Sequence, residues 1–81
     1  MELKDTIELM NSKDFKDRFK AEYHQLVIRA KGLKAMLEKY KNGTLPFNPK
    51  CSYEIFFTQL VYMENYINVL EERAKIENIE L

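Results

Sequence analysis

The chain has a single cysteine, Cys51, in 81 residues, so it cannot form an intrachain disulfide. Its only histidine, His24, lies far from Cys51 in the sequence, which leaves a metal site poorly supplied with ligands. A domain this short is marginally stable without a disulfide, a metal ion or a partner chain. We therefore expect Cys51 to be a free thiol, no cofactor to be bound, and association with a partner to supply stability.

Long apolar runs are also missing. No segment approaches the roughly 18 to 20 apolar residues that a membrane-spanning helix needs. The first ten residues, MELKDTIELM, are acidic and do not place a basic region ahead of an apolar one, so they do not resemble a secretory signal. We expect a soluble protein of the cytoplasm without a membrane partner.

The residues that catalysis needs are few and scattered. His24 is followed by Gln25 and has no second ligand at metal-binding spacing, and Ser12 and Ser52 have no base that the sequence reveals. A glycine-rich phosphate loop is absent, and so is a strand to carry one. The sequence predicts that the protein is not an enzyme.

Charge is balanced in total but uneven along the chain. Residues 13–50 hold ten Lys/Arg against four Asp/Glu, whereas residues 51–81 hold two against six. A basic helix and an acidic helix would attract each other when paired antiparallel. Alternatively, the basic residues of the middle segment also meet an anionic ligand. Charge alone favours the first interpretation, the attraction between the two helices.

Two heptad seams predict the fold. One lies in the stretch YEIFFTQLVYMENYINVLEER and steps by four and three residues. The other has the same steps and lies in the basic middle segment. The first seam contains Phe56, Leu60, Met63, Ile67, Leu70 and Ala74, and the second contains Phe19, Tyr23, Leu26, Ala30, Leu33, Leu37 and Tyr40. Together they predict an all-α antiparallel hairpin of two long helices.

Capping residues and breakers set the expected boundaries within one domain, residues 1–81. We predict a short helix over about 2–11, a long helix over about 14–41, a loop over 42–51, and a second long helix over about 52–78. Asp14 or Ser12 can cap the first long helix and Ser52 the last one. Gly43 can end the first long helix in a left-handed conformation, and the two prolines disfavour helix in the loop.

The last helix carries more apolar surface than one partner helix can cover. A second row steps by four and three on a different face, through Tyr62, Tyr66, Val69, Arg73 and Ile76. We therefore predict a homo-oligomer. The short first helix can dock on its own hairpin or on a neighbour's, and the tail is expected to fray or to pack on a neighbour through Ile76, Ile79 and Leu81. Gly32, inside the first long helix, either permits a close helix crossing or is simply tolerated.

Aromatic residues lie among basic ones at the start of the first long helix. An aromatic ring beside a guanidinium is the local chemistry of nucleobase and phosphate binding. Phe19, Tyr23 and Tyr66 fall on helical spacing that is typical of a core, whereas Phe15 precedes the seam and is flanked by charges. Duplex DNA is not an expected partner, because the second long helix is acidic and the turn is long.

Two stretches resemble a family of small helical phage proteins, related to a crAss-like phage protein, that includes the anti-CBASS cyclic-oligonucleotide sponges. The first, RFKAEYHQLVIRAKGLKAML, carries the pattern through Glu22, Leu26, Arg29 and Leu33. The second, FFTQLVYMENYINVLEER, carries it through Gln59, Leu60, Met63, Tyr66, Leu70 and Arg73. Together the stretches cover most of the chain from Asp14 to Arg73.

The resemblance implies a hexameric sponge of helical hairpins that sequesters cyclic di- and trinucleotides without cleaving them. By the family's pattern, Phe15 would stack on a base, Arg29 would meet phosphate, and Arg73 would serve a trinucleotide site. Phenylalanine stands at position 15 where the family pattern has tyrosine, and the loop is longer than in the family.

The leading hypothesis is therefore a phage anti-defence protein that binds cyclic-oligonucleotide immune messengers in the cytoplasm of an infected or lysogenic bacterial host. A protein-binding inhibitor, such as an anti-CRISPR or a host adaptor, is the alternative and would use the face of Tyr62 and Tyr66. A purely structural coiled-coil module is a third possibility.

Overall fold

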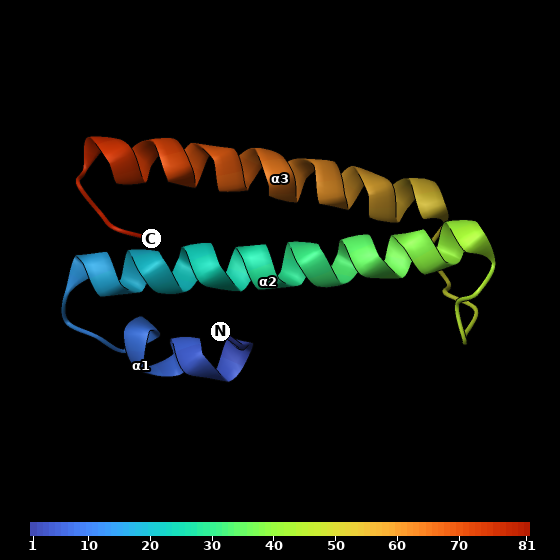
Figure 1. Ribbon diagram of the computed structural model, residues 1–81, viewed down its shortest axis with the longest axis horizontal. Helices are drawn as coiled ribbons and strands as arrows, with labels where there is room; N and C mark the ends of the chain where they lie inside the picture. The colour runs from blue at the N-terminus through green and yellow to red at the C-terminus, as the bar shows by residue number, and fades with distance from the viewer.

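Four helical segments and no strand make up the computed structural model, which describes residues 1–81. A 3-10 helix, η1 (Leu3–Thr6), leads into the one-turn α1 (Ile7–Met10), and the two long helices are α2 (Phe15–Asn42) and α3 (Tyr53–Ile76). Figure 1 shows α2 in the middle, α3 antiparallel to it on one side, and the short N-terminal helices on the other. The prediction of an all-helical fold with two long helices is confirmed.

Local chemistry sets both ends of α2. The Asp14 carboxylate accepts a hydrogen bond from the backbone N–H of Lys16 at 2.9 Å, which satisfies one of the free donors of the first turn. At the other end Gly43 has φ 71°, a left-handed conformation that costs glycine little and side-chain-bearing residues more. The capping residues Asp14 and Gly43 thus determine where α2 begins and ends.

Helix α3 begins at a serine cap and ends in a tight reverse turn. The Ser52 hydroxyl accepts from the backbone N–H of Ile55. The helix stops at Ile76 rather than near Asn78, because Asn78 has φ 57° and the N–H of Ile79 donates to the carbonyl of Ala74 at 2.8 Å. This turn directs the tail back toward α2 (Figure 1).

The tail packs within its own chain, and the prediction that it frays or needs a neighbour was wrong for Ile79. Ile79 is buried in one cluster with Phe19, Leu70 and Ala74, and Leu70 keeps only 1% of its surface exposed. The reversal after Asn78 places Ile79 on this cluster, which a continued helix would not have done. Ile76 and Leu81 remain exposed.

A second cluster continues the core toward the loop. Ala30, Leu37 and Leu60 are buried there, with flanking side chains of both long helices packed against them. Those flanking residues are Leu33, Met36, Tyr53, Phe56, Met63 and Ile67. Both clusters consist largely of residues of the two predicted seams, so the seams join α2 to α3.

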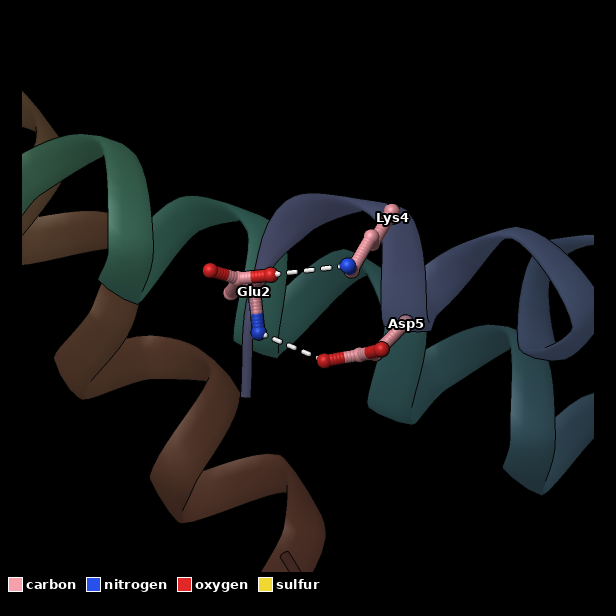
Figure 2. A network of polar contacts seen from close by, with 3 residues as sticks. All are labelled: Glu2, Lys4 and Asp5. Carbon is pink, nitrogen blue, oxygen red and sulfur yellow. Dashed lines mark hydrogen bonds and ion pairs between the residues drawn. The ribbon is translucent and has the colours of Figure 1, made fainter.

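The N-terminal arm, residues 1–11, packs on α2 of its own chain. Its first turn is closed by Glu2, whose backbone N–H donates to the Asp5 carboxylate at 2.8 Å and whose carboxylate pairs with Lys4, as Figure 2 shows. Thr6 is completely buried; its hydroxyl donates to the Leu3 carbonyl and accepts from Gln25 Nε2 of α2 at 2.9 Å. The Thr6–Gln25 bond therefore fastens the arm to α2.

Part of the loop also lies along α2. Leu45, Pro46 and Phe47 line a hollow together with residues of the second half of α2, including Gly32 and Met36. Phe47 nevertheless keeps 54% of its surface exposed. The α2 face that is turned away from α3 is thus covered by the arm at one end and approached by the loop at the other.

The outer face of α3 stays uncovered. Tyr62, Val69 and Ile76 of the second predicted row are 70%, 53% and 80% exposed, and Ile55, one heptad before Tyr62, is 59% exposed. Tyr66, on the same row, is less exposed because its hydroxyl bonds the Glu22 carboxylate of α2. We call Ile55, Tyr62, Val69 and Ile76 the outer stripe of α3.

Gly32 has no packing role within the chain, because a Cβ built there would meet nothing within 4 Å. Of the two alternatives, a close crossing is therefore excluded within the chain, and Gly32 is simply tolerated there. We predict that Gly32→Ala stabilises the protein by about 1 kcal/mol, since alanine favours a helix interior. Urea unfolding followed by circular dichroism measures this change. A loss of stability, or a changed assembly state, would instead show that another chain packs against Gly32.

Candidate ligand-binding site

Phe15, the first residue of α2, stands at an open position, with 45% of its surface exposed. Its ring meets that of Phe19 edge to face, with centroids 6.2 Å apart. Because Phe19 is buried and fixed in the core, it supports Phe15 from one side and leaves the other side free. An exposed ring held in this way can stack on a planar ligand.

Arg73 reaches the same end of the hairpin from α3. Its guanidinium carbon lies 4.9 Å from the centre of the Phe19 ring, a cation–π contact, and the side chain also pairs with Glu77 at 3.1 Å. Phe15 and Arg73 therefore both contact Phe19. The structure brings these two predicted site residues together, although they are far apart in the sequence.

Arg29 lies elsewhere on α2, with its side chain exposed and with no ion pair or hydrogen bond. It follows Phe15 by two heptads, so the two residues share a helix face but are separated by a rise of about 21 Å. One chain therefore does not bring Phe15 and Arg29 to the same point.

The surroundings of Arg29 form an open hollow of about 440 Å³ between the arm and the α2 surface, which we call the arginine hollow. It is lined by Met10 of the arm and by Arg18, Glu22, Gln25, Leu26 and Arg29 of α2. The seam analysis did not single out Arg18 as a site residue. The signal that identifies it is the spacing of Arg18, Gln25 and Arg29, which differ by seven and four positions and so share one face.

Cations of α2 are not used to join the two long helices. The chain has thirteen Lys/Arg, yet only two ion pairs form, Lys4–Glu2 in the arm and Arg73–Glu77 at the end of α3. No ion pair links α2 to α3, although charge alone favoured attraction between these two helices. The basic surplus of the middle segment is thus left available to an anion, as the second interpretation of the charge pattern requires.

The opposite side of the hairpin carries a polar bond between the long helices. The Tyr23 hydroxyl donates to the Glu71 carboxylate at 2.7 Å. This bond, followed by burial and by the negative charge of Glu71, raises the pKa of Tyr23 above its usual 10.0. Tyr23 therefore stays neutral at physiological pH and acts as a structural link.

His24, next to Tyr23, is half-buried, and burial lowers its pKa below the usual 6.5, with further contributions from the N-terminal ammonium and Lys20. The folded state then takes up the proton less readily than the unfolded state, so stability is present above about pH 6.5 and is lost as the pH falls. We predict a lower melting temperature at about pH 5.5 than at about pH 7.5. His24→Gln should reduce this difference, and an unchanged difference would mean that other groups cause it.

Two further features bear on the kind of site. No group of three or more His, Cys, Asp or Glu side chains is placed to hold a metal ion, and Cys51 is a free, exposed thiol. In addition, neither long helix has an apolar stretch sufficient for crossing a membrane.

The helical hairpin, its free cations and its exposed aromatic ring define a small helical protein with the features of a binding module. The Sequestin family profile matches residues 13–76, which include both long helices and the loop, and the chain belongs to the Sequestin family. The family name indicates that a ligand is sequestered rather than transformed. No curated protein and no solved structure matches the chain.

Proposed function

We propose that this protein sequesters cyclic di- and trinucleotides, the messengers of the bacterial CBASS immune response, without cleaving them. In this proposal it is an anti-defence protein of a phage, related to the crAss-like phage family that its sequence resembles, and it acts in the cytoplasm of the infected or lysogenic host. Binding lowers the free messenger in proportion to the amount of protein.

The observation that carries the proposal is the set of unpaired cations on α2. Arg29 forms no ion pair within the chain, and no ion pair neutralises any of the other cations of α2. A phosphodiester is the complementary group, since a guanidinium donates charge-assisted hydrogen bonds to phosphate oxygens. The exposed ring of Phe15 supplies the surface on which a nucleobase can stack.

Separation along α2 supports a site shared between chains. Phe15 and Arg29 are about 21 Å apart along the helix, so a small cyclic ligand that uses both would take them from different protomers. The outer stripe of α3 provides the apolar surface for such assembly. We therefore propose a homo-oligomer, a hexamer by family resemblance, in which Phe15 stacks on a base, Arg29 binds phosphate and Arg73 serves the trinucleotide.

Thermal unfolding with a panel of cyclic di- and trinucleotides tests this function. A ligand that binds only the folded state stabilises it by about 2.7 kcal/mol at a hundred times its dissociation constant. We expect a higher melting temperature with at least one cyclic oligonucleotide, and recovery of the intact ligand after denaturation. A cooperative melt that no member of the panel shifts would refute the proposal.

Exposure of the outer stripe of α3 favours one second candidate, a protein-binding inhibitor. Exposed apolar residues in a row along one helix are typical of a protein–protein contact. In this case one host protein would bind at fixed stoichiometry, cyclic nucleotides would have no effect, and Val69→Glu would abolish the interaction. If the stripe instead joins copies of the chain, Val69→Glu would yield monomers.

A further inference from the structure

The two ends of the arginine hollow are both cationic. Arg18 is the first and Arg29 the last of its lining residues along α2, and their α-carbons are separated by a rise of about 16 Å. Both side chains are exposed, and neither forms an ion pair. Two long cationic side chains that line one hollow near its ends can bind two anionic groups of one molecule.

We propose that Arg18 is a second phosphate-binding residue, and that Arg18 and Arg29 bind phosphate groups of one cyclic oligonucleotide at the two ends of the arginine hollow. This inference rests on the proposed function and adds to it a residue, a location and a ligand requirement: the ligand must carry at least two phosphodiesters.

The Arg18 guanidinium is held in place by a hydrogen bond within the chain. One of its terminal nitrogens, Nη1, donates to the carbonyl of Ser12 at 2.8 Å, in the turn between the arm and α2. A guanidinium has five N–H donors in a fixed plane, so this single bond holds the group and leaves most donors free. Fixing the side chain beforehand reduces the entropy that binding must remove.

Glu22 determines which part of a ligand fits between the arginines. Its carboxylate lies in the lining and accepts from the Tyr66 hydroxyl of α3, which leaves it acceptor capacity. A negative charge there repels a phosphate from the middle of the hollow and accepts hydrogen bonds from base or sugar donors. The phosphates are therefore directed to the arginines at the two ends.

The arm supplies one wall of the hollow through Met10. Gln25, also in the lining, holds this wall in place, because its amide nitrogen bonds both the Thr6 hydroxyl and the Met10 sulfur. The family match begins at residue 13, after the arm. An element outside the matched region therefore shapes the hollow in which we place the phosphates.

The test measures affinity by isothermal titration calorimetry for two probes, cyclic di-AMP with two phosphodiesters and 3′,5′-cyclic AMP with one. The variants are Arg18→Gln, Arg29→Gln and, as a matched control, Lys31→Gln, which removes one charge on the opposite face of α2. We expect Arg18→Gln and Arg29→Gln each to weaken cyclic di-AMP binding by about tenfold or more. Lys31→Gln should change it by less than about twofold, and 3′,5′-cyclic AMP should bind weakly to every variant.

The outcomes distinguish failure of the inference about Arg18 from failure of the proposed function. Cyclic di-AMP binding that Arg29→Gln weakens and Arg18→Gln does not would overturn the inference and leave the proposed function in place. Equal losses for all three variants would also overturn it, because they would reflect net charge alone. No binding of cyclic di-AMP or of any other panel member by the wild-type protein would refute both. Circular dichroism confirms that each variant is folded.

Discussion

Leu70→Ala is expected to lower the free energy of unfolding by about 2–5 kcal/mol, the usual cost of removing a buried leucine side chain. Leu70 is 1% exposed and belongs to the cluster that joins α2, α3 and the tail. Small domains have only about 5–15 kcal/mol of stability, so the variant should melt at a much lower temperature. Thermal and urea unfolding followed by circular dichroism measure the change.

The matched control for this variant is Val69→Ala, its neighbour on the outer stripe, which is 53% exposed. In a single chain this substitution should change stability by less than about 0.5 kcal/mol. Similar losses for both variants at high protein concentration, and a smaller loss for Val69→Ala on dilution, would show that the stripe is buried between copies. A small effect of Leu70→Ala would contradict the cluster described here.

Arg29→Glu is expected to abolish cyclic dinucleotide binding while the helical content stays unchanged. The substitution replaces the cation that we propose to bind phosphate with an anion, in a hollow that already contains Glu22, so it removes an attraction and adds a repulsion. We expect a loss of more than about a hundredfold in affinity, measured by titration calorimetry. The far-ultraviolet circular dichroism spectrum and the melting temperature should match those of the wild-type protein.

Lys31→Glu makes the same change of charge on the face of α2 turned away from the arginine hollow, and it serves as the control. Because the site is local and exposed charges are screened by salt, this variant should retain binding at physiological ionic strength. Unchanged binding by Arg29→Glu would contradict the site assignment. Equal loss in both variants would indicate that only the overall charge matters.

Much of the fold could be predicted because apolar residues recur at heptad spacing in both long helices. Leu60, Leu70 and Ala74 of one seam, and Phe19, Ala30 and Leu37 of the other, are all buried. The reversal after α3 could not be predicted. Asn78 adopts a left-handed conformation, which is far less common for asparagine than for glycine, so the residue type alone does not indicate it. The place of the arm was also open, because its apolar residues fit any exposed helix face, and the choice depends on the bonds that Gln25 makes to Thr6 and Met10.

The candidate site was less predictable than the fold. Resemblance pointed to Phe15, Arg29 and Arg73, but their relation in space depends on how α2 and α3 align. The alignment places Arg73 over Phe19, which no local pattern indicates. Arg18 was missed as a site residue because its spacing to Gln25 and Arg29 gains meaning only once the hollow that the three residues line is seen. The ligand-binding roles of all four residues stay predictions.

In the proposed function Phe19 links folding to recognition, and this has a consequence for how such a protein can evolve. The same ring fills the core and supports both Phe15 and Arg73. A substitution at Phe19 that altered ligand preference would also destabilise the hairpin. Adaptation to a new ligand is therefore expected at residues whose substitution leaves the fold stable. Under the proposal, ligand preference can change at Phe15 and Arg29 without loss of the fold, because neither residue belongs to the buried core.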